Sequence, residues 1–135
     1  MELHDVEPPL ASDQRFEGLL GLEFTELSAE TVRARVPVRE ELLQPTGRIH
    51  GGVYAAIAES LASRGTADAV IPANQVAVGL SNQTSFLRPL AAGHITSVAT
   101  RRHRGRTTWV WDVDHLDDAG RRCAVSRVTI AVREG

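Results

Sequence analysis

The short turns between the predicted strands in the second half of the chain limit the possible folds more than any other feature. Four segments there alternate apolar and polar residues, at 75–87, 95–103, 107–116 and 122–133. The turns between them are Ala92-Gly93, Arg104-Gly105 and 117–120. Parallel strands need crossovers of a dozen or more residues. We therefore expect successive strands of this group to be antiparallel neighbours.

One long helix precedes these strands. The segment 52–70 is rich in alanine and free of proline until Pro72. Upstream, 14–20 is predicted as a short helix, and 22–27 with 31–38 as a hairpin. The order of elements predicts an α+β domain over 14–135, in which one helix packs against a curved antiparallel sheet. Residues 1–13, with Pro8-Pro9, are expected to form a loose tail.

Composition excludes several classes of protein. The 135 residues suit one domain, and the net charge of −2 with a pI near 6.2 gives no electrostatic reason to expect binding to nucleic acid or an acidic membrane. There is no signal-peptide pattern and no spanning apolar run, so a cytoplasmic location is expected. Cys123 is expected to be a buried thiol, and no spacing of His and Cys predicts a metal site or another cofactor.

The predicted helix has two different faces. Val53, Ile57 and Leu61 form a stripe that should bury against the sheet, and Glu59 points the other way. A glutamate so placed is ordinarily solvated. The outer face, however, has small residues where a solvated face normally has long charged ones: Gly52, Ala55, Ala62, Ser63 and Thr66. We expect a second helix or a bound ligand to cover this face and Glu59 to be available for attack or proton transfer.

The start of the helix offers a second chemical group. Free backbone N–H groups at a helix N-terminus favour negative charge, and Gly51-Gly52 leave them accessible to the oxygen of a carbonyl under attack. The glycines can also simply shape the turn. The rise per residue separates them from Glu59 by roughly 10–12 Å, beyond reach of one carbonyl group. We therefore expect a homodimer in which a two-fold axis builds two composite sites.

The chain resembles the hot-dog-fold thioesterases of the phenylacetate-degradation type, and within them the 4-hydroxybenzoyl-CoA thioesterases with a mid-helix carboxylate. The likeness covers about 16–133, with its strongest stretches at 49–60, 77–89, 107–113 and 123–133. It implies an acyl-CoA thioesterase, assembled as a homotetramer. It also implies a catalytic carboxylate at Glu59, a backbone donor at Gly51 and a side chain at Gln44 that orients the substrate.

Two further residues near the site, Ser63 and His50, also have expected roles. Ser63 stands where relatives have threonine, so its hydroxyl could align water. His50 is expected to brace the glycine turn, with a catalytic role as the alternative. For CoA, the resemblance implies a binding set made of Gly52, Phe86, Leu87, Arg88, His103, Arg104, Arg106 and Thr107. Arg106 departs from the small hydroxyl residue of close relatives. Trp109 and Trp111 are expected in the core rather than stacked on a ligand.

Several alternatives remain open from the sequence. Glu59 can attack the thioester carbon, giving an anhydride, or activate a water. The acyl group can be 4-hydroxybenzoyl, 1,4-dihydroxy-2-naphthoyl or phenylacetyl, or the specificity can be broad. A hot-dog dehydratase would need an aspartate paired with the histidine at the helix start, and His50 has none nearby in sequence. A non-catalytic acyl-CoA-binding module would not need Glu59.

Overall fold

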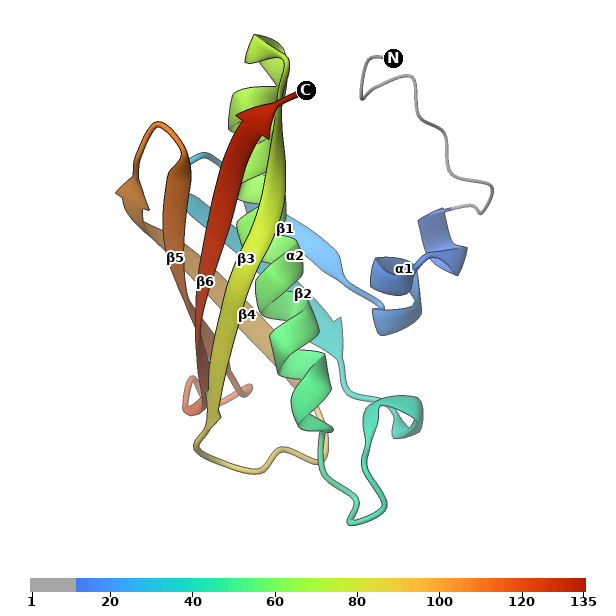
Figure 1. Ribbon diagram of the computed structural model, residues 1–135. Helices are drawn as coiled ribbons and strands as arrows, with labels where there is room; N and C mark the ends of the chain where they lie inside the picture. The colour runs from blue at the N-terminus through green and yellow to red at the C-terminus, as the bar shows by residue number, and fades with distance from the viewer. Residues whose placement is uncertain (1–11) are drawn as a thin grey trace.

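The structure, a computed structural model, describes residues 12–135, so nearly all of the tail predicted over 1–13 lies outside the described residues. Within these described residues, two helices and six strands form the domain, joined in places by short 3-10 turns (Figure 1). In chain order the elements are η2 Ser12–Gln14, α1 Phe16–Leu20, β1 Glu23–Leu27, β2 Thr31–Pro37, η3 Glu40–Leu42, α2 Gly51–Val70, η4 Ile71–Ala73, β3 Gln75–Phe86, β4 His94–Arg104, β5 Thr108–Leu116 and β6 Arg122–Glu134.

The six strands form one curved antiparallel sheet in the order β1-β2-β4-β5-β6-β3. Helix α2 lies along the concave side of this sheet, and Figure 1 shows the strands curving around it. The predicted α+β class, with one long helix against a curved antiparallel sheet, is confirmed. The predicted boundaries of the helix and strands also agree with the structure to within one or two residues.

The expected pairing of the first two strands after the helix is wrong. Strand β3 pairs with β6 along its whole length and occupies an edge of the sheet, whereas β4 lies between β2 and β5. The link between β3 and β4 includes Pro89 and crosses the end of the domain below the start of α2 (Figure 1). Two of its amides, those of Leu87 and Arg88, donate to Cys123 O on β6. This anchoring leads the chain from the edge strand β3 to the place of β4 between β2 and β5, so β3 and β4 do not form a hairpin.

The core fills the space between α2 and the sheet. The stripe of Val53, Ile57 and Leu61 is buried as predicted, as are Trp109 and Trp111. Ala62 and Thr66, predicted on the outer face, are also fully buried. Trp111 Nε1 donates to Thr66 Oγ1 at 2.9 Å, and Thr66 Oγ1 donates to Ala62 O at 2.9 Å. The hydroxyl therefore tolerates burial because it has both an acceptor and a donor.

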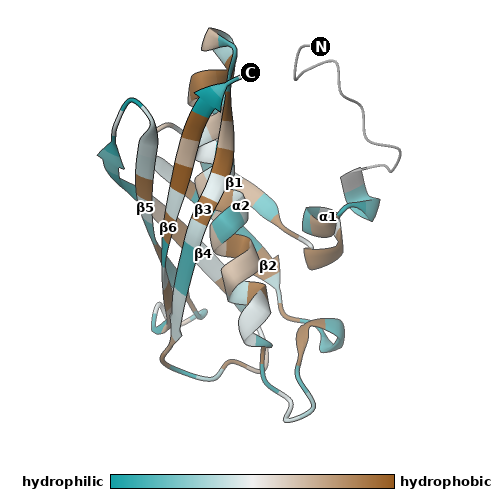
Figure 2. Ribbon diagram, in the orientation of Figure 1, coloured by the Kyte–Doolittle hydropathy of each residue, from teal (hydrophilic) through white to brown (hydrophobic). Residues whose placement is uncertain are grey.

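The buried thiol predicted at Cys123 is also confirmed, since Cys123 is a free cysteine that belongs to the core. Figure 2 shows hydrophobic residues along much of β6 and in the half of β3 nearer Gln75, whereas most of the other half of β3 is polar. The two strands differ in exposure, however. Most of β6 is buried, whereas β3 exposes Val78, Leu80 and Phe86 by 48%, 56% and 60%. The open edge of the sheet thus exposes apolar side chains on either side of the polar run Ser81–Ser85.

Candidate active site

The N-terminus of α2 is capped by the residue just before it. Backbone N–H of Gly52 donates to His50 Nδ1 at 2.9 Å, so the His50 ring satisfies one of the free amides of the first turn. This hydrogen bond fits the bracing role expected for His50. Gly51 is the first helical residue, and the Phe86 ring packs on its Cα side: a Cβ added at Gly51 would lie 2.7 Å from Phe86 Cζ. A side chain at this position would therefore have to displace the Phe86 ring.

A cavity of about 380 Å³ opens beside Gly51. Its lining includes five of the predicted site residues, which come from the loop before α2, the start of α2 and the end of β3: Gln44, Gly51, Phe86, Leu87 and Arg88. The other lining residues are Arg48, Ile49, Tyr54, Pro89 and Leu90. The structure thus brings together the predicted backbone donor, the predicted orienting amide and part of the predicted CoA-binding set.

The two glycines of the helix start face different cavities. Gly52 and His50 line a neighbouring space, also of about 380 Å³, together with Leu42 and Val53. A Cβ added at Gly52 would lie 3.0 Å from His50 Nδ1, so the absence of a side chain here leaves room for the His50 ring that caps the helix. Of the two residues, Gly51 is the one beside the cavity that holds Gln44 and Phe86.

Glu59 lies half-buried on α2, two turns after Gly51. Its carboxylate fills the space that a side chain at Gly79 would occupy: a Cβ added there would overlap Oε1 and lie 3.1 Å from Cδ. Strand β3 has a bulge between Gly79 and Ser81. The bend of the strand and the missing side chain at Gly79 leave room for the Glu59 carboxylate. We expected a second helix or a ligand to cover this face. In the structure, β3 of the same chain already flanks Glu59 and covers part of it.

Within residues 12–135, no ion pair or hydrogen bond engages the Glu59 carboxylate. Many other carboxylates of the described chain, such as Asp68, Asp112 and Asp117, are bound to arginine. An unpaired carboxylate in a partly enclosed place retains its lone pairs for chemistry. Ser63, predicted to assist it, is half-buried one helical turn further on.

A chain of polar side chains ties this part of α2 to the sheet. Asn82 Nδ2 on β3 donates to Ala55 O at 2.8 Å, and Thr84 Oγ1 donates to Asn82 Oδ1 at 2.9 Å. Beyond Thr84, the chain continues through hydroxyl and imidazole groups of the inner sheet face, namely Ser126, His115 and Ser97. Burial lowers the pKa of His115 to about 3, so its ring is neutral and bonded at both nitrogens.

The predicted CoA-binding residues separate into two groups. Phe86, Leu87 and Arg88 lie at the end of β3 beside Gly51, whereas His103–Thr107 forms the β4–β5 turn. That turn is near the opposite end of β3, because Thr107 O accepts from Val132 N and β6 pairs Val132 with Ala77. Twelve residues of β3 span roughly 35–40 Å. One chain therefore does not bring the two groups together.

Three residues of this region were not anticipated from the sequence. The glycine inside a predicted strand, Gly79, could have indicated a close approach by another group. Asn82 gave no such signal, because its partner is a backbone carbonyl of the distant helix. Arg48 stands within the motif before the glycines, but nothing in the sequence indicated that it faces the same cavity as Arg88.

Comparisons with known proteins agree with this geometry. The thioesterase superfamily profile matches residues 46–124. The solved structure of Rv1847 from Mycobacterium tuberculosis has a TM-score of 0.86 and 39% identity, covering 89% of this chain and 97% of that one. Thioesterase PA1618 from Pseudomonas aeruginosa has a TM-score of 0.85 and 36% identity, covering 89% and 86%. The proofreading thioesterase EntH of Cronobacter turicensis is 36% identical over 84% of this chain and 82% of its own.

Each of the two solved structures covers 89% of this chain. The matched profile includes the helix start, Glu59 and β3, since it runs from the loop before α2 into β6. Among residues 12–135, no helix is long and apolar enough to cross a membrane. The chain belongs to the thioesterase superfamily, has its hot-dog fold and is a thioester hydrolase of the acyl-CoA thioesterase type.

Proposed function

We propose that this thioesterase hydrolyses an aromatic acyl-CoA to the free acid and CoA, with Glu59 as the reactive carboxylate. The observation that carries the proposal is the position of Glu59 over Gly79, half-buried and bound to no cation in the described chain. A glutamate with a purely structural role would be expected to have an arginine or amide partner, as Asp112 has in Arg127. The carboxylate is held in place by packing, while its oxygens remain available.

The second part of the site comes from another copy of the chain. Gly51 and Glu59 lie on one helix, eight residues and about 12 Å apart, which is too far for both to act on one carbonyl. The open edge of β3, with Val78, Leu80 and Phe86 exposed, is the surface we propose for the contact. An antiparallel pair of such edges around a two-fold axis brings opposite ends of two chains together.

The same symmetry unites the two groups of predicted CoA-binding residues. In one chain the His103–Thr107 turn lies at the end of β3 opposite Arg88. In a two-fold pair, the turn of one copy approaches the Gly51 end of the other. Each composite site would then contain Gly51, Gln44 and Arg88 from one copy and Glu59, Ser63 and the basic turn from its partner. A homotetramer of two such pairs is consistent with this arrangement.

The chemistry needs only these groups. The Gly51 N–H polarises the thioester carbonyl, and Gln44 orients it. Glu59 then either attacks the carbonyl carbon, releasing CoA as the thiolate and leaving a mixed anhydride that water cleaves, or removes a proton from an attacking water. The thiolate takes up a proton from solvent in both routes. Ser63 can align the water, and His50 preserves the helix start.

Two rings beside Gly51 support an aromatic acyl group. The Phe86 ring covers Gly51, and the Tyr54 ring lies 6.3 Å away, centre to centre, inclined by 41°. Ile49 and Leu90 complete an apolar wall. A flat ring packs well against such neighbours. A bicyclic hydroxynaphthoyl group would make the same contacts, so we include it with the simple benzoyl compounds in the test.

The test is the turnover of a panel of acyl-CoAs by the wild type and by Glu59→Gln. The amide keeps the size of the side chain but cannot attack or take a proton, so we expect kcat to fall at least a hundredfold with little change in KM. Aromatic acyl-CoAs should have higher kcat/KM than hexanoyl-CoA in the wild type. Single-turnover hydrolysis in ¹⁸O water distinguishes the routes, because only the anhydride route labels Glu59. Full activity of the amide variant would refute the proposal.

A further inference from the structure

We propose that Asn82 is a positioning residue for Glu59: its side-chain amide fixes β3 against α2 and so holds the carboxylate where it reacts. This inference rests on the proposed function and adds a residue to it. Asn82 Nδ2 donates to Ala55 O at 2.8 Å. In a regular α-helix such as α2, the carbonyl of Ala55 also accepts from the N–H of Glu59, four residues later. The Asn82 side chain therefore binds the helix at the carbonyl that also holds the Glu59 backbone.

Strand β3 contacts α2 at three successive turns of the helix, in the pairs Phe86–Gly51, Asn82–Ala55 and Gly79–Glu59. The first and last of these are packing contacts. Within residues 12–135, the Asn82 bond is the one hydrogen bond between the two elements. Strand β3 has only β6 as a neighbour, and the bulge after Gly79 interrupts that pairing. The position of β3 beside Glu59 therefore depends strongly on Asn82.

A chain of hydrogen bonds that begins in the core fixes the direction of the Asn82 amide. Thr84 Oγ1 donates its only proton to Asn82 Oδ1 at 2.9 Å. Ser126 must then donate to Thr84 Oγ1 at 2.8 Å, and His115 Nε2 to Ser126 Oγ at 3.0 Å. Ser97 in turn donates to His115 Nδ1 at 2.7 Å. The chain thus runs in one direction and ends with the Asn82 NH₂ group facing α2.

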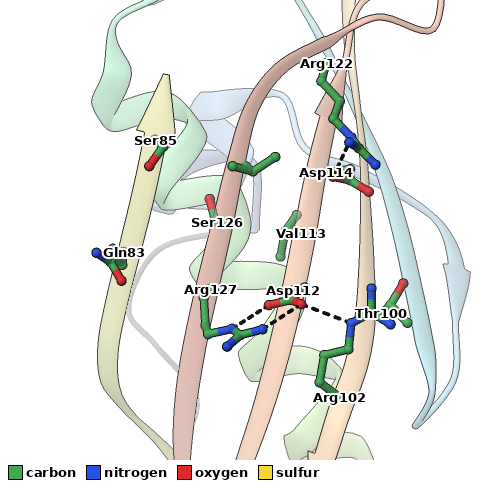
Figure 3. Close-up of a pocket in the computed structure, with 11 residues that line it drawn as sticks. Gln83, Ser85, Thr100, Arg102, Asp112, Val113, Asp114, Arg122, Ser126 and Arg127 are labelled. Atoms are coloured by element: carbon green, nitrogen blue, oxygen red, sulfur yellow. Dashed lines mark hydrogen bonds and ion pairs between the residues drawn. The ribbon is translucent and has the colours of Figure 1, made fainter. Parts of the chain in front are cut away.

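The residue between the two members of this chain on β3 provides a natural comparison. Side chains alternate along a strand, so Asn82 and Thr84 share the face turned to α2. Gln83 instead lines the pocket on the outer face of the sheet (Figure 3). Within the described residues its amide makes no hydrogen bond. Asn82 is exposed in one chain, and the contact proposed between two β3 edges would shield its bond from water.

The first test removes the bond and its orienting hydroxyl separately. Asn82→Ala removes the donor to α2, and Thr84→Val removes the hydroxyl while keeping the size of the side chain. We expect kcat to fall about tenfold in the first and about threefold to tenfold in the second. KM should change by less than about twofold, because a slightly displaced carboxylate loses rate and not binding. Thr84→Ser should recover most of the wild-type kcat, and Gln83→Ala, the matched control, should be fully active.

A double-mutant cycle with Glu59→Gln separates this proposal from the proposed chemistry. If Asn82 acts through the carboxylate, Asn82→Ala should cost about tenfold in the wild type and less than about twofold in the Glu59→Gln background. Equal losses in both backgrounds would overturn the proposal and leave Glu59 as the reactive group. A Glu59→Gln variant with full activity would instead refute the proposed function, and this inference with it.

A variant at the far end of the chain controls for general loss of stability. Ser97→Ala should lower the urea midpoint at least as much as Thr84→Val, yet leave kcat within about twofold of the wild type. Nitrogen-15 NMR should find the ring proton of His115 on Nε2, and a proton on Nδ1 would overturn the orienting role of Thr84. The proposal also fails if Asn82→Ala keeps the wild-type kcat, or if the kcat of all these variants follows their stability alone.

Discussion

Gly79→Ala adds a single methyl group to the chain, and we expect it to lower kcat strongly. A Cβ at this position would overlap Glu59 Oε1 and lie 3.1 Å from Cδ and 3.4 Å from Oε2. Ordinary contact requires about 3.4 Å or more, so the carboxylate has to retreat by about 1 Å or more. Displacement of a reacting group by about 1 Å can cost roughly a hundredfold in rate.

The same substitution should leave folding almost unaffected. The atoms in the way belong to the end of a flexible side chain, and Gly79 does not have a positive φ angle. Alanine also restricts the unfolded chain, which offsets part of any strain. We therefore expect kcat to fall by about ten- to a hundredfold while the free energy of unfolding changes by less than about 1 kcal/mol. Steady-state kinetics and urea denaturation measure the two quantities.

A double-mutant cycle isolates the contact. Glu59→Asp shortens the side chain by one methylene, so the added methyl at Gly79 has less to displace. Gly79→Ala should therefore cost much less in the Glu59→Asp background than in the wild type. Ser81→Ala, at the other side of the bulge and exposed, is the matched control on β3. Additive effects in the cycle, or an unchanged kcat in Gly79→Ala, would refute the reasoning.

Two predictions concern stability. Because burial lowers the pKa of His115 to about 3, below about 6.5 in an unfolded chain, acid protonates the unfolded state first. Stability should fall as the pH drops below about 6.5, by about 2 kcal/mol between pH 6 and 4.5, and urea titrations of His115→Gln should show a flatter slope. Trp111→Phe removes the donor to Thr66 and leaves a void, so unfolding in urea should show a loss of about 2–3 kcal/mol. A loss below about 0.5 kcal/mol would contradict that estimate.

The local structure could be predicted well because local signals determine it. The apolar stripe of α2 and the alternation along each strand identify the elements, and Pro72 marks the end of the helix. The place of β3 could not be predicted in this way. The turn residues Ala92-Gly93 indicate where β4 begins, but the partner of β3 depends on the anchoring of Leu87 and Arg88 to β6. That contact joins segments more than thirty residues apart.

The site could be predicted only in part. Gln44, Gly51 and Phe86 share a cavity as the motifs indicate, since the loop, the helix start and the end of β3 meet at one end of the domain. Helix periodicity alone misplaced Thr66, because its hydroxyl reaches Trp111 and is satisfied in the core. The glycine inside a predicted strand, Gly79, offered a local signal for a bulge or a close approach, but nothing in the local pattern identifies Glu59 as the group that lies there.

The central claim is that Glu59 of one copy and Gly51 of another act on the same thioester. It is tested most directly by mixing Glu59→Gln chains with Gly51→Val chains, whose added side chain collides with Phe86. Each variant alone should be nearly inactive. After exchange in equal amounts, half of the dimers are mixed and have one intact site of two, so the pool should regain about one quarter of wild-type activity. Activity that stays at the sum of the two parents, while light scattering shows that chains have exchanged, would contradict the shared site.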